Sequence, residues 1–204
     1  RPLDQRNGFT IPFRVGPRQL LDFVTHPRWS LGQVIHGMPK MANFQAEGFH
    51  FDRTESRGKA DWTTLRQIRE RWQGKLIAKG VTSVEDALRL EKEGVDGIQV
   101  SGHGGRQLDA LPPPIQQLRA IRDAMGPDYP LFYDSGIRSG EDVVKAYAMG
   151  ANFVFLGRSM QYAAAAGGEL GLAKWWETLI NGVSITLALI GKTKLDEISD
   201  SLHQ

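Results

Sequence analysis

The sequence predicts an α/β fold in which parallel strands and helices alternate around a barrel, and three observations support this fold class. From Trp62 onward, four short apolar segments alternate with segments of helical periodicity. The apolar segments LIAK, GIQVS, LFYD and NFVFL are nearly continuous, which is typical of parallel strands buried on both faces. Two of the strand-helix units are related by an internal repeat. This combination is typical of a parallel α/β barrel.

The composition is that of an ordinary globular protein. Of the 204 residues, 41% are hydrophobic and 24% are charged, which excludes a disordered or collagen-like chain. The absence of Cys excludes a disulfide scaffold, a thiolate metal site and a cysteine nucleophile. No dense stripe of Lys and Arg points to nucleic acid, and no run of 18 apolar residues predicts a spanning helix. The first residues, RPLDQRNGF, are neither a signal peptide nor a Met start, so we expect a chain that is partial at its N-terminus.

Residues 1–60 are predicted to form an irregular, basic segment and not a second core. Five prolines and several glycines interrupt it, which leaves room only for short helices near 17–25 and 29–37. Residues 1–40 carry six basic side chains against two acids, a net charge of +4 that leaves −2 for the remainder. Apolar side chains lie between these charges, so the segment suits an anionic membrane surface or a partner as well as solvent.

Residues 61–204 are predicted to alternate helix and strand up to a long last helix. The expected helices cover residues 62–73, 83–93, 114–125, 139–149 and about 171–190, the last closed by Gly191. The expected strands cover residues 75–79, 96–101, 130–134 and 152–156. Four strands leave two bare edges, and an eight-stranded barrel needs about 250 residues. We therefore expect about half a barrel here, with the other half outside this sequence; pairing with a second copy of the chain is the alternative.

The internal repeat supports the alternation of strand and helix. Five residues recur identically 56 positions later, namely Gly80, Ser83, Glu85, Asp86 and Gly94 as Gly136, Ser139, Glu141, Asp142 and Gly150. In each copy a glycine permits a tight turn after a strand, a serine caps the next helix, and acids occupy its first turn. A second glycine then ends the helix before another strand follows.

Residues suited to catalysis or binding follow each of the four strands, at the end where barrels of this kind carry their sites. The loops containing Gly136 with Arg138, and Gly157 with Arg158, are suited to bind a phosphate, because glycine lets the backbone approach and a helix begins behind it. Asp134 can accept a hydrogen bond from a ligand hydroxyl. The structural alternatives are glycines that only form turns, arginines that only meet surface acids, and an aspartate that fixes its own turn.

The second strand leads into a glycine-rich loop that contains His103 and Arg106. The histidine can take a proton from a substrate hydroxyl, and the arginine fork suits a carboxylate held beside it. A single loop histidine is often structural, but the pairing with an arginine favours function. Lys79 ends an otherwise apolar strand and needs an electron-rich partner, which could be a substrate carboxylate, a Schiff-base carbonyl or the N1–O2 edge of a flavin.

The run SGHGGRQLD, preceded by LIAKG and followed by DSGIRSGEDVVKA and FLGRSMQYA, resembles the FMN-dependent 2-hydroxy-acid oxidases and dehydrogenases. That family includes glycolate oxidase, lactate dehydrogenase and mandelate dehydrogenase. The segments RPLDQRNGF and HPRWS are most similar to the mandelate and bacterial lactate dehydrogenase branches. The resemblance covers nearly the whole chain, and it implies the C-terminal half of a (β/α)8 TIM barrel, strands 5–8.

The resemblance also implies FMN as the cofactor, no metal, and a role for each matching residue. His103 would be the catalytic base in the oxidation of an L-2-hydroxy acid to the 2-oxo acid, and Arg106 and Arg1 would bind the substrate. The cofactor contacts would come from Lys79 at the flavin N1–O2 edge, Asp134 at the ribityl chain, and Arg138, Gly157 and Arg158 at the phosphate; we assign Ser101 and Gly136 to the same cofactor site.

Two departures from the family pattern affect this expectation. Gly102 stands where most relatives have Asn before the histidine, which removes a side-chain hydrogen bond from the loop. The upstream half of the family barrel, which contributes active-site tyrosines, an aspartate for the histidine and further FMN contacts, has no counterpart in this sequence.

The expected partners follow from the same resemblance. They are a 2-hydroxy-acid substrate, an electron acceptor (oxygen, a quinone or a cytochrome), the upstream half of the barrel and further copies in a homotetramer. We expect a cytoplasmic protein with peripheral contact to the inner face of the membrane through residues from about 10 to 60. The alternatives are a sibling FMN barrel enzyme such as an isomerase, and a non-catalytic phosphate- or FMN-binding half of a split or cleaved enzyme.

Overall fold

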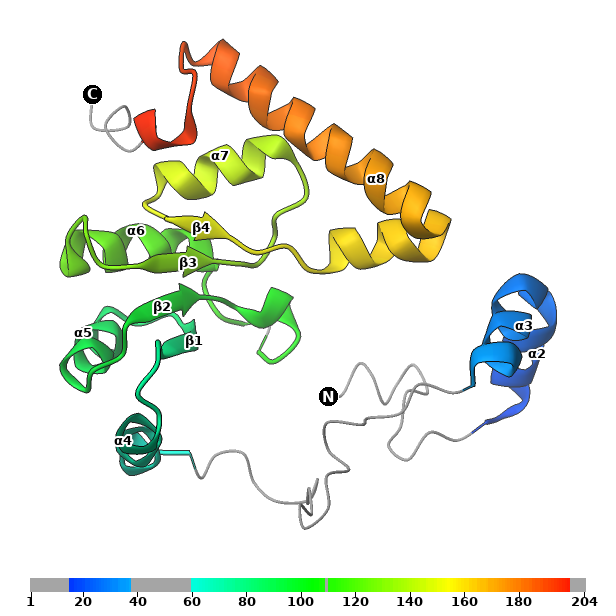
Figure 1. The fold of residues 1–204 in the computed structure, drawn as a ribbon, viewed down its shortest axis with the longest axis horizontal. Helices are drawn as coiled ribbons and strands as arrows, with labels where there is room; N and C mark the ends of the chain where they lie inside the picture. Colours follow the sequence, from blue (N-terminus) through cyan, green and yellow to red (C-terminus); the bar gives the residue numbers. More distant parts are fainter. Residues whose placement is uncertain (1–14, 38–59, 109, 199–204) are drawn as a thin grey trace. The chain divides into compact units, whose positions relative to one another are not determined.

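The computed structural model describes residues 15–37, 60–108 and 110–198 (Figure 1). The chain divides into two compact units, residues 1–59 and residues 60–204. Arg1 and most of the segment expected to meet a membrane lie outside the described residues.

The described part of the first unit consists of two helices, α2 (Pro17–Thr25) and α3 (Pro27–His36). Each begins with proline, whose missing N–H is tolerated at the first helical position. The second helix therefore begins two residues before its predicted start. The two helices pack through the rings of Phe23 and Trp29, whose centroids are 5.1 Å apart, and Ser30 Oγ donates to the Phe23 carbonyl at 2.6 Å.

The second unit is built on a parallel sheet whose strands lie in sequence order (Figure 1). The four strands are β1 (Ile77–Val81), β2 (Gly97–Val100), β3 (Leu131–Tyr133) and β4 (Phe153–Val154). β1 has the predicted length but is shifted by two residues, and the other three strands are shorter than predicted and lie inside their predicted ranges. The register places Lys79 opposite Gln99, and the ladder is irregular between Lys79 and Val81, where Gly80 has φ +95°.

The helices of this unit follow the predicted alternation with one correction. They are α4 (Trp62–Arg71), α5 (Val84–Lys92), α6 (Pro114–Met125), α7 (Gly140–Ala148) and α8 (Arg158–Leu189), with 3-10 turns η3 (His103–Gly105) and η4 (Leu195–Glu197). The predicted last helix, near 171–190, corresponds to the part of α8 that follows a kink at Gly168, where φ is +58°. The correction concerns the helical residues from Arg158 to this kink, which were not predicted.

The two repeat copies have the same helix caps. Ser83 Oγ accepts from Asp86 N at 3.3 Å, and Ser139 Oγ accepts from Asp142 N at 3.2 Å. At the other ends, Gly94 and Gly150 have φ +81° and +100° and are each followed by a backbone bond of 3.0 Å back to the last helical turn. The sequence signals for turn, cap and stop therefore act alike in both copies.

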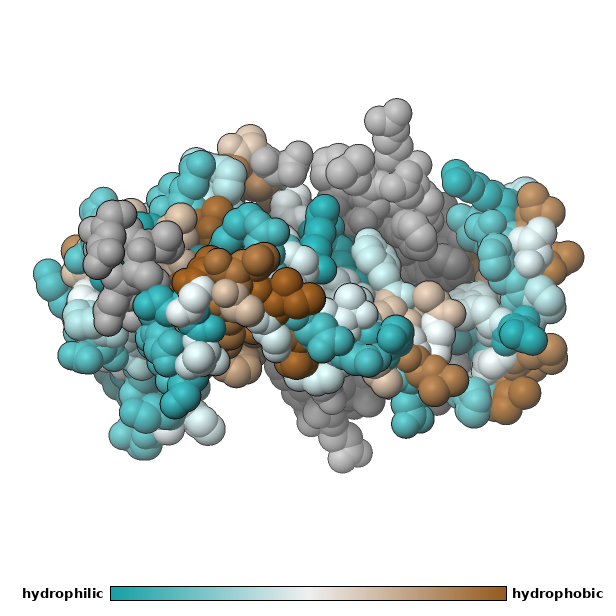
Figure 2. Space-filling model, turned by 90° about the horizontal axis from the view of Figure 1, so that it is seen from above, coloured by the Kyte–Doolittle hydropathy of each residue, from teal (hydrophilic) through white to brown (hydrophobic). Residues whose placement is uncertain are grey.

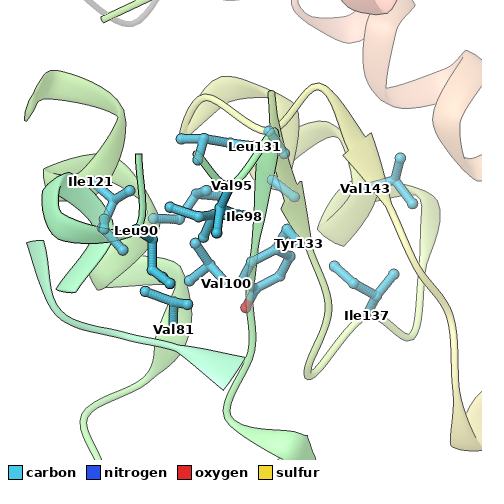
Figure 3. Close-up of a cluster of buried hydrophobic side chains, with 14 of the residues drawn as sticks. Val81, Leu90, Val95, Ile98, Val100, Ile121, Leu131, Tyr133, Ile137 and Val143 are labelled. Carbon is cyan, nitrogen blue, oxygen red and sulfur yellow. The ribbon is translucent and has the colours of Figure 1, made fainter. Parts of the chain in front are cut away.

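The hydrophobic core lies between one face of the sheet and helices α5, α6 and α7 (Figure 3). Ile98, Val100, Leu131 and Tyr133 point from β2 and β3 into this core and are almost fully buried. On the opposite face, Phe153 is 52% exposed. Burial on both faces is therefore found for β2, all of whose residues are buried, but not for β4 at Phe153.

Helices α7 and α8 lie against each other at a glycine contact (Figure 1). A Cβ built on Gly140 would lie 2.1 Å from Val183 N and 2.2 Å from the Gly182 carbonyl carbon. The backbones therefore approach more closely than any side chain at residue 140 would allow.

Candidate active site

A cavity of about 870 Å³ lies where the loops that follow the strands meet. Its lining includes eight of the ten predicted site residues: Lys79, His103, Arg106, Asp134, Gly136, Arg138, Gly157 and Arg158. Ser101 is buried directly beside this lining, and Arg1 lies outside the described residues. Parallel strands bring their carboxyl ends to one edge, which explains why residues so distant in the sequence converge. Their individual roles stay predictions.

An ion pair between Lys79 and Asp134 joins the first strand to the loop after the third. Lys79 Nζ also donates to Ser101 Oγ at 3.2 Å. The lysine side chain is 44% exposed and the aspartate 18%, so the ammonium remains accessible from the cavity while the carboxylate is enclosed. The arrangement leaves a positive charge at the end of β1, where an electron-rich ligand can meet it.

The Asp134 carboxylate accepts hydrogen bonds from four side chains. Lys79 and Gln99 donate to Oδ2, the second at 2.5 Å, while Ser101 and Ser135 donate to Oδ1, the second at 2.9 Å. A carboxylate offers about four acceptor positions, so these donors use all of them. A ligand hydroxyl that binds Asp134 must therefore replace one of these donors.

Burial raises the pKa of Asp134, but the hydrogen bonds from Lys79, Ser101 and Ser135 outweigh it and hold the net pKa below its ordinary value of 3.8. A carboxyl group with a lowered pKa stabilises the folded state above its ordinary pKa and loses that contribution as the pH falls. We expect the stability difference between the protein and Asp134→Asn to be largest near pH 6 and to shrink below about pH 4. Urea unfolding of both proteins at pH 6 and pH 3 measures this; an equal difference at both pH values would contradict it.

His103 occupies the first position of η3, three residues after the end of β2. Its φ of +51° is unusual for a residue with a side chain, and such conformations gather at functional sites. The imidazole lies over Gly80, where a Cβ would be 2.9 Å from His103 Cε1. The glycine at the end of β1 thus makes room for the ring, which lines the cavity and remains exposed.

The two predicted phosphate arginines lie in different loops and line the same cavity. Arg158 begins α8 and donates from Nη2 to the Gly104 carbonyl at 2.6 Å. This bond connects Arg158 to the loop of residues 101–106 that contains His103, called the histidine loop below. Arg138 precedes α7, and its backbone N–H donates to the Asp142 carboxylate at 3.0 Å. Both guanidinium groups add positive charge where the loops meet.

The cavity lining fits an anionic ligand with an aromatic ring system, such as FMN. Arg138, Arg158 and Lys79 provide positive charge, and Phe155 and Leu156 provide apolar contact. The volume is in the range of small-molecule sites, about 300–1,000 Å³. Among the residues that the structure describes, no group of three or more His, Cys, Asp or Glu is placed to hold a metal ion.

Sequence reasoning missed two residues that donate hydrogen bonds to the Asp134 carboxylate, Gln99 and Ser135. Gln99 is a polar residue in the strand GIQVS, and its burial on β2 could have marked it as a partner for a nearby carboxylate. Ser135 gave no signal beyond its place after Asp134. Its contacts with the histidine loop bridge more than 30 residues of sequence.

Comparison with protein families gives a match over residues 1–204 to the model described as FMN-dependent dehydrogenase. An (S)-mandelate dehydrogenase from Pseudomonas putida is 40% identical over 211 residues, which cover 100% of this chain and 53% of the relative. An L-lactate dehydrogenase from Chromohalobacter salexigens is 38% identical over 203 residues, 92% of this chain and 50% of the relative. The chain spans about half the length of the curated relatives it matches.

Solved structures agree with these matches. The crystal structure of the monotopic membrane protein (S)-mandelate dehydrogenase has a TM-score of 0.86 and 39% identity, covering 98% of this chain and 55% of that chain. A mandelate oxidase structure has a TM-score of 0.65 and 38% identity, covering 69% of this chain and 41% of that chain.

Proposed function

Because the chain belongs to the FMN-dependent dehydrogenase family, we propose that the protein takes part in the oxidation of an L-2-hydroxy acid, lactate-like or mandelate-like, to the 2-oxo acid. The names of its relatives support this reaction class. The observation that carries the proposal is the meeting of Lys79, His103 and Arg106 at one cavity that also contains two further arginines.

Each residue has a separate task in this reaction. The Arg106 guanidinium binds the substrate carboxylate through two parallel hydrogen bonds, which orients the hydroxyl-bearing carbon. His103 removes the proton of the substrate hydroxyl. When FMN is bound, Lys79 would supply positive charge to the flavin, and Arg138 and Arg158 would hold the phosphate. FMN, when bound, supplies the two-electron acceptor.

The visible absorption spectrum of the purified protein tests this function. The protein is loaded with FMN under anaerobic conditions and mixed with glycolate, L-lactate and (S)-mandelate in turn. We expect one of these acids to bleach the oxidised-flavin spectrum. A flavin spectrum that none of them bleaches would favour a sibling FMN enzyme such as an isomerase. Failure to bind FMN would contradict the proposal.

Replacing Arg106 with lysine should weaken substrate binding much more than FMN binding. An ammonium cannot form the two parallel bonds of the guanidinium fork, and charged hydrogen bonds contribute enough for a loss of about 10- to 100-fold. The dependence of flavin bleaching on substrate concentration measures the first effect, and an FMN fluorescence titration the second. Equal losses of both affinities would assign Arg106 to the cofactor instead.

We further propose that the two-helix unit, residues 15–37, contacts an anionic membrane surface. Figure 2 shows apolar side chains, in brown, on the surface of this unit. The apolar side chains that are more than half exposed are Leu20, Leu21, Val24, Trp29, Leu31, Val34 and Ile35. The same two helices carry the exposed side chains of Arg18 and Arg28. Within the described ranges no helix is long and apolar enough to cross a membrane. The likeness to the monotopic membrane protein (S)-mandelate dehydrogenase supports this proposal.

Flotation with phosphatidylglycerol vesicles tests the membrane contact. The double variant Leu21→Glu, Val34→Glu places charges on side chains that are 63% and 81% exposed, so we expect it to lose vesicle binding without losing its fold. Leu170→Glu, at an 83% exposed position on α8, is the matched control and should still float. If the double variant floats as well as the control, the two-helix unit is not the contact.

The remaining partners are proposals of the same kind. Oxygen, a quinone or a cytochrome would reoxidise the flavin, and stopped-flow mixing of the reduced protein with each one identifies it. We propose a homotetramer located in the cytoplasm at the inner face of the membrane. Sedimentation equilibrium measures the oligomeric state.

A further inference from the structure

We propose that Ser135 is the positioning residue for His103, and this inference rests on the proposed function of His103 as the base. The Ser135 hydroxyl oxygen accepts a hydrogen bond from Gly102 N and another from Gly104 N, both at 3.1 Å. These are the two residues that flank His103 in the chain. One side chain from the loop after β3 therefore holds both sides of the histidine.

The hydroxyl of Ser135 has no freedom left to rotate. It donates its proton to Asp134 Oδ1 at 2.9 Å, and a hydroxyl has one donor and two acceptor positions. Donation to the carboxylate aims both lone pairs at the two N–H groups. Because Asp134 also pairs with Lys79, the lysine, the aspartate and the histidine loop form one connected network.

The backbone conformations of Ser135 and His103 support a positioning role for Ser135. Ser135 has φ +98° and His103 has φ +51°, conformations that persist only where several contacts impose them. The backbone of Ser135 is itself fixed, because the almost fully buried Tyr133 donates from its hydroxyl to the Ser135 carbonyl at 2.8 Å. The serine that holds the loop is thus anchored in the core.

The residue before His103 cannot provide such an anchor. Gly102 has no side chain, and a Cβ there would lie 2.7 Å from Pro114 Cγ. Pro114 begins α6, so the helix start and the glycine fit each other. Besides the two bonds that Ser135 accepts, the loop has the 3.1 Å bond from His103 N to Ser101 Oγ and the Arg158 contact at Gly104.

The variant Ser135→Gly tests the proposal, because glycine accepts the positive φ and removes only the hydroxymethyl group. In the FMN-loaded protein, amide hydrogen exchange at Gly102 and Gly104 is measured by NMR, together with FMN affinity and the rate of flavin reduction by the hydroxy acid. Ser83→Ala is the matched control, since it removes a serine hydroxyl that caps α5 away from the cavity.

We expect Ser135→Gly to speed exchange at both amides about tenfold and to slow flavin reduction about 10- to 100-fold, with FMN affinity nearly unchanged. Ser83→Ala should change none of the three. Unchanged exchange in Ser135→Gly would overturn the proposal, and so would faster exchange with an unchanged reduction rate. If the unaltered protein itself oxidises no hydroxy acid, the proposed function fails, while the exchange measurement still decides whether Ser135 holds the loop.

Discussion

Replacing His103 with alanine should slow reduction of the bound flavin by a 2-hydroxy acid about 10²- to 10⁴-fold and leave the flavin bound. General-base catalysis contributes an effect of this size. The exposed imidazole lines the same cavity as Lys79. Anaerobic stopped-flow absorption measures the rate, and FMN fluorescence measures retention of the cofactor.

Two further variants separate proton transfer from loop conformation. His103→Asn keeps a residue that tolerates positive φ but lacks a base, so it should be as slow as alanine. His36→Ala, at an exposed position in α3, should react at the unaltered rate. Loss of FMN from His103→Ala would assign that residue to structure.

Gly140→Ala should destabilise the protein by about 3 kcal/mol, the largest effect we expect of a change this small. The added methyl group would lie about 2 Å from backbone atoms of α8, and neither helix can turn a side chain aside to make room. Helices α7 and α8 would have to separate along their contact. The free energy of unfolding in urea, measured by circular dichroism, gives the change directly.

A second glycine in the same pair of helices provides the control. Gly167 lies in α8 with nothing within 4 Å of a built Cβ. Because alanine favours the helix over glycine, Gly167→Ala should be neutral or stabilise by up to about 1 kcal/mol. Similar losses of stability in the two variants would show that the close approach at Gly140 does not cause the destabilisation.

The parts of the fold that local signals specify were predictable. Ser83 and Ser139 cap their helices and Gly94 and Gly150 end them, because a cap depends on residues within one or two turns. The family, the α/β fold class shared with FMN-dependent TIM barrel enzymes, and the FMN dependence of that family are confirmed by the comparisons. The meeting of the four loops followed from the parallel topology alone.

The features that were missed depend on contacts between distant segments. The helical stretch from Arg158 to the kink at Gly168 was missed because Gly167 and Gly168 disfavour a helix at its end. The exposure of Phe153 on β4 was missed because an apolar strand has the same pattern whether one face or both faces are covered. The hydrogen bonds of Ser135 link two loops that are distant in the sequence, so no local sequence pattern predicts them.

The order of the strands has a consequence for the folding of the chain during its synthesis. Each strand pairs with the next one in the sequence, so the sheet can grow one strand at a time as the chain leaves the ribosome. The pair between Lys79 and Asp134 spans 55 residues and needs the third strand in place. A nascent chain that has folded β1 and β2 therefore carries the lysine without its carboxylate, and its ligand site is assembled only when β3 joins the sheet.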